Sequence, residues 1–172
     1  MALSPKSRRL EIVPMRPADL DEVLEIERLS HRSPWARQVF IEELARDWAH
    51  LIVLKERRSG VAGMASVAFC NFWVVRDEVH VLNVATHPDE RRKGHASRVL
   101  EHVIEFALRH ACRYLTLEVR RGNQGAIRLY RQFGFRPVGI RPNYYVEDGE
   151  DAIVMRLELT PPNATPEEEV SE

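Results

Sequence analysis

Positive charge and a glycine precede the most regular helical pattern in the sequence. Segment 82–96 reads LNVATHPDERRKGHA and joins an apolar run to the helix expected from Ala96 onward. A glycine at a helix start lets an anion approach the backbone, where the N–H groups of the first turn have no partner within the helix. Arg91, Arg92 and Lys93 add cations beside the positive end of the helix dipole. This composition predicts a pyrophosphate-binding turn that needs no metal, with a basic, solvated turn as the alternative.

The second segment whose residues could take part in a reaction contains a carboxylate, that of Glu118. The strand expected over 114–119 has apolar side chains on one face, and this alternation puts Glu118 on the other face. On a central strand such a carboxylate is either a general base or the partner of a neighbouring cation such as Arg120 or Arg121. Tyr130 follows on a short helix, where by itself it is equally consistent with an ordinary core aromatic.

The elements that must hold these residues follow from hydrophobic periodicity and turn signals. A first helix opens at Pro17, with Glu27 and Leu29 among the positions on its inner side, and Asn123 caps a later helix that Gly134 ends. The expected strands are 10–13, 51–55, 61–75, 78–85, 114–119, 135–145 and 152–159, and the expected helices are 17–29, 36–46, 96–111 and 123–133. An antiparallel meander followed by crossover units predicts an α/β or α+β fold with a mixed sheet flanked by helices.

The length of 172 residues fits one domain, which we expect over residues 10–159. Residues 1–9 are expected to be a flexible tail, and residues 160–172, rich in proline and glutamate, a disordered acidic tail. The net charge of −1 argues against a nucleic-acid-binding protein and against attraction to an anionic membrane. No secretion signal and no spanning segment is recognisable, so we expect a cytoplasmic protein, either a monomer or a weak dimer.

Cysteine and histidine usage bears on metal and redox chemistry. Cys70 and Cys112 lie in apolar stretches without CxxC spacing and are expected to be small core residues. The seven histidines show no metal-ligand spacing, so the sequence predicts no metal. Neither cysteine has a histidine partner in sequence, which disfavours a covalent route through a thiol.

A family resemblance adds to this interpretation. Arg91-x-x-Gly94-x-Ala96 resembles the R/Q-x-x-G-x-G/A signature of the GNAT superfamily of acyl-CoA N-acyltransferases, and the element order over 10–159 is also similar. Alanine at 96, preceded by His95, departs slightly from the commoner glycine. The resemblance implies acetyl-CoA as donor, with the backbone of Val84, Ala85 and Thr86 holding the pantetheine arm and polarising the thioester. It also implies a pyrophosphate site formed by Arg91, Arg92, Lys93, Gly94, His95, Ala96 and Ser97.

Three further segments resemble one branch of that superfamily. Segment 117–135 (LEVRRGNQGAIRLYRQFGF), segment 143–155 (NYYVEDGEDAIVM) and Ser33-Pro34-Trp35 are similar to the RimI-like ribosomal-protein-alanine N-acetyltransferases and to archaeal N-terminal acetyltransferases. The resemblance implies that the acceptor is the N-terminal alanine of a small-subunit ribosomal protein. It makes Tyr130 the general acid and Asn123 a cofactor contact as well as a helix cap. The aromatic residues expected around the entering peptide are Trp35, Tyr144 and Tyr145.

These expectations combine into a direct transfer within a ternary complex, with Glu118 as base and Tyr130 as acid. An α-amine with a pKa of about 7.7–8.0 is roughly one-tenth neutral at pH 7, whereas a lysine at about 10.4 is almost entirely charged. A lone carboxylate base therefore favours the α-amine. Two alternatives remain open: acetylation of lysine side chains or small amines, and a non-catalytic module that binds acetyl-CoA.

Overall fold

A mixed sheet of seven strands forms the centre of the computed structural model, which describes residues 9–57 and 62–159. The expected tails and most of the expected turn at 57–60 lie outside the described residues. In chain order the elements are β1 (Leu10–Pro14), a 3-10 turn (Pro17–Asp19), α1 (Leu20–Ser30), α2 (Arg37–Leu44), β2 (Ala49–Arg57), β3 (Met64–Val75), β4 (Glu78–Thr86), a second 3-10 turn (Pro88–Glu90), α3 (His95–Arg109), β5 (Tyr114–Arg120), α4 (Gln124–Gln132), β6 (Arg136–Tyr145) and β7 (Glu150–Glu158).

The strands lie in the order β1-β2-β3-β4-β5-β7-β6. β4 and β5 run parallel, and the other neighbouring strands of the described sheet are antiparallel. The parallel pair is connected through α3, because two parallel neighbours require a crossover. The mixed α/β class and the order of elements predicted from the sequence are both confirmed.

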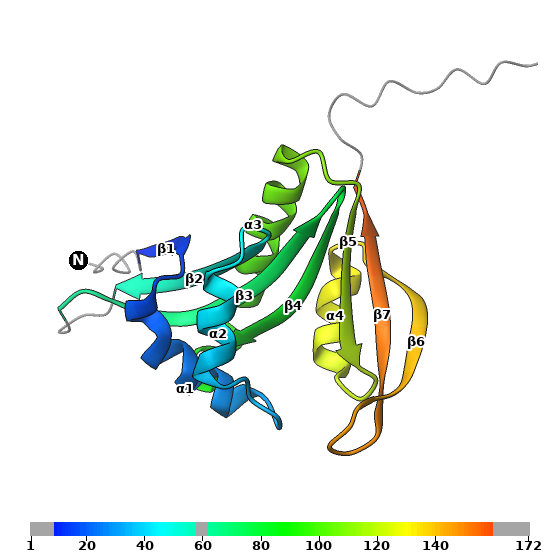
Figure 1. Ribbon diagram of the computed structural model, residues 1–172, viewed down its shortest axis with the longest axis horizontal. Coiled ribbons are helices and arrows are strands. Elements are labelled where there is room, and N and C mark those ends of the chain that lie inside the picture. The colour runs from blue at the N-terminus through cyan, green and yellow to red at the C-terminus, as the bar shows by residue number, and fades with distance from the viewer. Residues whose placement is uncertain (1–8, 58–61, 160–172) are drawn as a thin grey trace, which may run out of the picture.

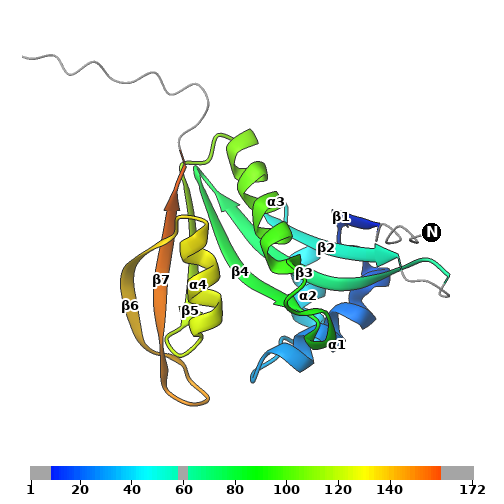
Figure 2. The ribbon, with the colours of Figure 1, turned by 180° about the vertical axis from the view of Figure 1, so that it is seen from behind.

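Helices cover the sheet on both faces (Figure 1). Viewed from behind, α3 and α4 lie in front of the sheet, whereas α1 and α2 lie on its other side (Figure 2). The larger core cluster joins α3 and α4 to the central strands through side chains such as Val103, Leu115 and Ile127, and a smaller cluster beneath α1 and α2 includes Phe40 and Phe69.

The first helix differs from its prediction. Pro17 opens a 3-10 turn, and the α-helix begins three residues later at Leu20. Leu29, expected on the inner side, is 40% exposed, whereas Glu27 is buried as expected although it is an acidic residue. Cys70 and Cys112 are free thiols in buried positions, which confirms their assignment as core residues.

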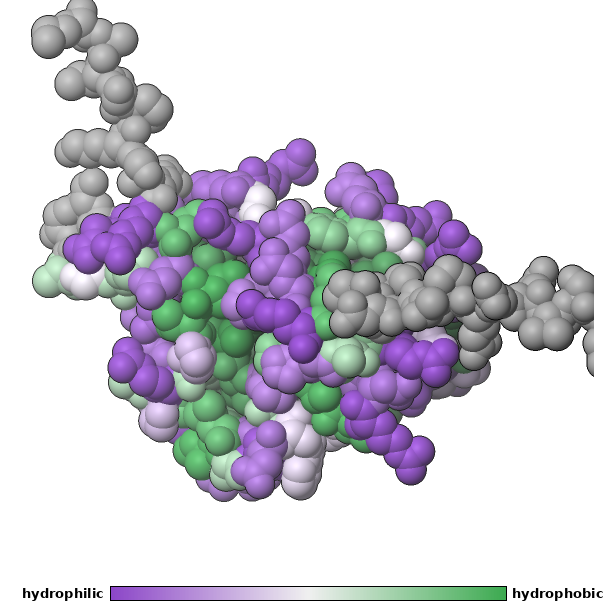
Figure 3. Space-filling model, turned by 90° about the horizontal axis from the view of Figure 1, so that it is seen from above, coloured by the Kyte–Doolittle hydropathy of each residue, from purple (hydrophilic) through white to green (hydrophobic). Residues whose placement is uncertain are grey.

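The surface mixes polar and apolar residues. Seen from above, hydrophilic side chains cover much of the outline, and hydrophobic residues are visible in patches between them (Figure 3). Among the described helices, none has the length and the apolar character that crossing a bilayer requires.

Candidate active site

The strands β4 and β5 separate halfway along their length, and this separation creates the site. Their pairing runs from Glu78 opposite Tyr114 to Val81 opposite Leu117 and ends there. On its other side β4 carries one extra residue, Leu82, where the register with β3 shifts. Such a bulge bends a strand and increases its twist, which turns the second half of β4 away from β5. The two strands are seen to diverge in Figure 1.

A cavity of about 790 Å³ occupies this gap. That volume lies within the range of small-molecule and cofactor sites. Val84, Ala85 and Thr86, which the family resemblance assigns to the pantetheine arm, line it from β4, and no strand pairs with them on the β5 side within the described sheet. In a strand whose other edge is paired, alternate residues aim their N–H and C=O groups outward. The backbone of β4 therefore presents hydrogen-bonding groups to whatever enters the gap.

The basic turn at one end of the cavity leads into α3. Gly94 is the N-cap of α3 with φ of 79°, in the left-handed region that glycine adopts without strain, and no side chain caps the first turn. A Cβ atom built on Gly94 meets nothing within 4 Å, so the space in front of the helix start is open. The first N–H groups of α3 thus face an open position suited to an anion.

The side chains of the turn differ in what they can contribute. Arg91 lines the cavity and donates to the carbonyl of Thr86 (3.3 Å) and the hydroxyl of Ser30 (3.4 Å), while Arg92 is exposed. The Lys93 ammonium contacts Glu90 at 2.8 Å. His95 is buried, which leaves its backbone as the part that can reach a ligand. Of the other residues predicted here, Ala96 lines the cavity. Gly94 and Ser97 lie at the same helix start but are not among the described residues that line it.

A buried group behind this turn contains residues of metal-ligating type. The ligand atoms of Glu56, Glu90 and His95 lie within 4.8 Å of one another. Lys93 already contacts the same oxygen of Glu90 that lies 3.7 Å from the His95 ring. The Lys93 ammonium therefore places a positive charge beside the Glu90 carboxylate of this group.

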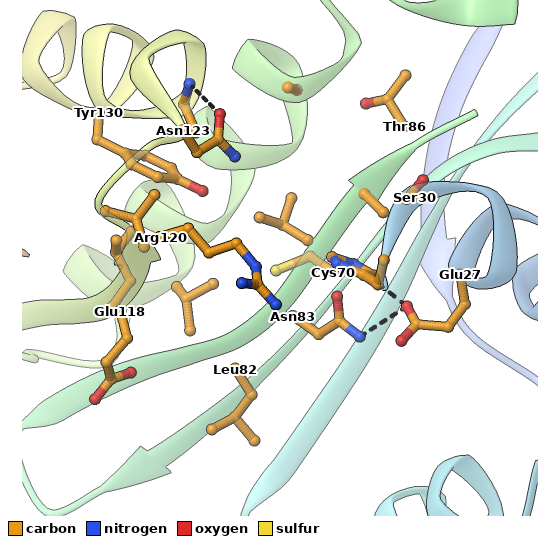
Figure 4. Close-up of a pocket in the computed structure, with 18 of the residues that line it drawn as sticks. Glu27, Ser30, Cys70, Leu82, Asn83, Thr86, Glu118, Arg120, Asn123 and Tyr130 are labelled. Carbon is orange, nitrogen blue, oxygen red and sulfur yellow. Dashed lines mark hydrogen bonds and ion pairs between the residues drawn. The ribbon is translucent and has the colours of Figure 1, made fainter. Parts of the chain in front are cut away.

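Tyr130 projects from α4 toward the cavity (Figure 4). The residue is 8% exposed, and the centroid of its ring lies 5.8 Å from that of Phe135. Burial raises the pKa of its hydroxyl above the ordinary tyrosine value, with smaller contributions from Cys70 and Tyr145, so the group keeps its proton. Asn123 lines the cavity nearby and accepts a hydrogen bond from the amide of Ala126 at 3.2 Å. Its predicted role as helix cap is confirmed, and a contact with the cofactor remains compatible with it.

Glu118 is the first residue of β5 beyond the paired segment, and it lines the cavity. Its carboxylate lies 2.7 Å from Nε2 of His80 and 3.4 Å from Arg141. Burial acts to raise the pKa of Glu118, but the contacts with His80 and Arg141 outweigh it and the pKa is lowered. The group is therefore ionised at neutral pH. Arg120 and Arg121, the neighbouring cations considered in the alternative interpretation, do not contact it among the described interactions.

Aromatic residues surround the end of the cavity that faces the α1–α2 segment. Trp35, Tyr144 and Tyr145, the aromatic residues expected around the entering peptide, all line it, which brings together residues more than a hundred positions apart in sequence. Trp35 packs against Phe40 at 5.5 Å, and the two tyrosine rings meet edge to face at 5.1 Å. Burial raises the pKa of Tyr145 to about 12, although the guanidinium of Arg120 acts in the opposite direction.

Three residues of the site, Arg120, Asn83 and His80, were not among the site residues predicted from the sequence. Arg120 lies over the ring of Tyr145 at 3.9 Å and binds Asp148 and Glu150, each at 3.0 Å, together with Glu147. Asn83 donates to Glu27 at 2.9 Å (Figure 4). His80 contacts Glu118 as described above. The contacts of these residues join segments that are distant in sequence, so spacing along the chain could not predict them. The available signal was a charged or polar residue at an inward position, such as Glu27 within an apolar pattern.

Comparison with known proteins identifies the family. The model of the acetyltransferase (GNAT) family matches residues 20–135. A Bacillus subtilis protein, named provisionally as a [ribosomal protein bS18]-alanine N-acetyltransferase, is 38% identical over 142 residues, or 82% of this chain and 90% of that protein. The Escherichia coli enzyme of that name is 34% identical over 144 residues, covering 83% of this chain and 93% of its own length.

Solved structures agree with the sequence comparison. The crystal structure of the ribosomal-protein-S18-alanine N-acetyltransferase from Escherichia coli superposes with a TM-score of 0.77 at 33% identity, covering 91% of this chain and 99% of that one. Ard1 from Thermoplasma volcanium gives a TM-score of 0.77 at 25% identity over 88% and 98% of the two chains. The chain therefore belongs to the acetyltransferase (GNAT) family, as an acetyl-CoA-dependent N-acetyltransferase.

Proposed function

We propose that this enzyme transfers the acetyl group of acetyl-CoA to the N-terminal α-amine of a protein, and that the acceptor is the N-terminal alanine of ribosomal protein S18. The observation that carries the chemistry is that Glu118 and Tyr130 line one cavity from opposite faces of the divided sheet. The names of the Bacillus and Escherichia relatives support the acceptor. A ribosomal protein as acceptor fits the cytoplasmic location expected from the sequence.

The donor is proposed to lie across the gap between β4 and β5. The open helix start at Gly94, with no capping side chain, suits a diphosphate, and Arg91 and Arg92 add positive charge. The outward-facing backbone groups of Val84, Ala85 and Thr86 suit the pantetheine arm and the thioester carbonyl. Asn123 approaches the same arm from the start of α4.

Glu118 is proposed to take the proton that the amine loses. A carboxylate with a lowered pKa is too weak a base to remove a proton readily from an ammonium ion. It is strong enough to accept one from the much more acidic nitrogen that forms once a neutral amine has attacked a carbonyl. This order suits an α-amine, which is partly neutral near pH 7, better than a lysine side chain.

Tyr130 is proposed to protonate the departing thiolate. Its raised pKa keeps the hydroxyl protonated, and its position on α4 puts that hydroxyl on the side of the gap away from the Glu118 carboxylate (Figure 4). The amine can then approach from one face while the thiol leaves toward the other, so no acyl-enzyme is required. Burial raises the pKa of the Cys70 thiol, which argues against this cavity-lining cysteine as a nucleophile.

The acceptor can be tested with peptides. Thiol release from acetyl-CoA would be followed with an S18-derived peptide that begins with alanine, with the same peptide carrying a blocked N-terminus, and with variants that differ at residue one. We expect the free alanine peptide to react and the blocked peptide, lysines included, to be inert. Equal rates with the blocked peptide would instead favour lysine acetylation. Binding of acetyl-CoA without thiol release for any acceptor would favour a non-catalytic module.

A further inference from the structure

A histidine on β4 holds the carboxylate of Glu118. Nε2 of His80 lies 2.7 Å from Oε2 of Glu118, whose side chain is 8% exposed, while that of His80 is 32% exposed. A carboxylate accepts hydrogen bonds when ionised, so Nε2 is the donor. Glu118 lines the cavity, and His80 is not among the described residues that do. His80 therefore acts from behind Glu118.

The two residues stand on either side of the point where the sheet divides. His80 lies opposite Thr116 in the paired half of β4 and β5, and the pairing ends one residue later at Val81 and Leu117. Glu118 is the next residue of β5 and has no strand partner on the β4 side in the described sheet. The side chain of His80, in the paired part of β4, therefore contacts Glu118, the first residue of β5 beyond the paired segment. This contact limits how the carboxylate can turn.

Arg141 is the second cation near the carboxylate, but its contact is weaker. It lies 3.4 Å from Oε1, and its side chain is 56% exposed, so solvent screens the interaction. The hydrogen bond to His80 is shorter and more buried. His80 is therefore the main support of Glu118.

We propose that His80 is a positioning residue of this acetyltransferase, which holds the Glu118 carboxylate in place and aimed at the acceptor amine. The proposal deepens the proposed function and rests on the role of Glu118 as base. Holding a catalytic group by a hydrogen bond from a rigid element is what a preorganised site requires. Without His80 the burial of Glu118 would act unopposed at Oε2 and favour its protonated form.

Other ionisable groups surround the pair and affect the titration of Glu118. On β4 itself, Glu78 accepts a hydrogen bond from Thr116 and lies 4.0 Å from Arg156 of β7. On the β3 side, Trp73 lies opposite His80 and donates to Glu43 of α2 at 2.6 Å. Further charged or titratable groups on the elements around the pair are Arg46, which contacts Glu43, Arg141 of β6, and Tyr145 and Arg120 at the acceptor end.

The test compares His80→Leu with His80→Gln, which retains an N–H donor. The carboxyl of Glu118 would be followed through a pH titration by carbon-13 NMR of glutamate-labelled protein, with its resonance assigned by its absence in Glu118→Gln. For His80→Leu we expect the pKa of Glu118 to rise by about one unit or more and kcat/KM to fall roughly ten- to a hundredfold. His80→Gln should recover much of both. His102→Leu, on α3 outside the cavity, is the matched control.

The outcomes separate this inference from the proposed function. If His80→Leu leaves the titration of Glu118 unchanged, the inference is overturned whatever happens to the rate, because a loss of rate alone would reflect general damage. If His80→Leu shifts the titration but not kcat/KM, the positioning role is overturned. If Glu118→Gln retains the wild-type rate, the proposed base is wrong, while the titration still reports on the contact between the two residues.

Discussion

At the scale of single residues, replacement of Glu118 by glutamine is the most direct test of the base. Glutamine keeps the shape of the side chain but cannot accept the proton, so we expect kcat/KM to fall about 10²–10⁴-fold with little change in the KM for acetyl-CoA. Steady-state thiol release with the alanine peptide measures this. Glu101→Gln, at an exposed position of α3 outside the cavity, is the matched control and should behave as wild type. A Glu118→Gln rate near wild type contradicts the assignment.

Tyr130→Phe removes the proposed acid and retains the ring. Because the ring supplies the packing against Phe135, we expect unfolding midpoints close to wild type and a kcat lower by about 10²-fold. The raised pKa carries a second expectation: the hydroxyl stays protonated beyond pH 10, so kcat should show no alkaline decline from this group. A pH profile of kcat measured up to pH 10 tests whether the pKa of Tyr130 is raised. A decline centred below pH 10 that disappears in Tyr130→Phe would contradict the raised pKa.

Single residues show what local pattern can and cannot predict. The face of Glu118 and the cap formed by Asn123 followed from spacing, because both depend on neighbours within a few positions. The partners of Glu118 did not, since His80 lies on another strand 38 residues away. The same holds for Arg120, which the sequence offered only as an alternative partner of Glu118 and which instead contacts the acidic residues of the β6–β7 turn.

At the scale of elements, Glu27 joins three parts of the structure. Its carboxylate, buried in α1, accepts hydrogen bonds from the amide of Trp35 at 2.8 Å and from Asn83 of β4 at 2.9 Å. Glu27→Ala leaves both donors without this acceptor, so we expect the free energy of unfolding to fall by about 2–4 kcal/mol. Chemical denaturation measures it, and Glu25→Ala, on the exposed side of the same helix, is the control. Equal losses in the two variants would contradict the bridging role.

The turn before α3 makes a prediction about binding. In Gly94→Ala the backbone must hold an alanine at φ of 79°, which costs about 1–2 kcal/mol, and the added methyl group points into the open space proposed for the diphosphate. We expect the Kd for coenzyme A, measured by calorimetry, to rise about tenfold or more. Gly139→Ala adds a methyl group on β6, where φ is not positive and nothing lies within 4 Å, and should bind as wild type. Unchanged affinity in Gly94→Ala would argue against the helix start as the anion site.

Element boundaries followed the sequence closely where periodicity was strong. The longest helix and the hairpin strands lie within a few residues of their predicted ends. The entry into α1 differed, because Pro17 is compatible with both a 3-10 turn and an α-helix, and the choice depends on the Arg16 and Asp19 contacts that close the turn. Leu29 lies one residue before the end of α1 and is exposed, against its prediction.

At the scale of the whole molecule, the division of the sheet was the feature that the sequence left unpredicted. The order of elements indicated a mixed sheet, but the end of pairing at Val81 depends on the bulge at Leu82, which is defined by its register with β3. On its other side β5 pairs with β7, and the paired residues are more than thirty positions apart in the sequence. Such pairings are non-local, so neither spacing nor propensity along the chain reveals that the centre of the sheet opens into a cavity.

A ligand that spans this division should stabilise the whole domain. Coenzyme A contacts both halves of the sheet in the proposed arrangement, and at a free concentration one hundred times its Kd it would add about 2.7 kcal/mol. For a chain of this size that corresponds to an increase in Tm of roughly 5–11 °C. Thermal unfolding with increasing coenzyme A measures the shift, and pantetheine at equal concentration, which lacks the diphosphate, should give much less. Equal Tm shifts for the two ligands would mean that the β4–β5 gap alone supplies the binding energy. The start of α3 would then not be part of the binding site.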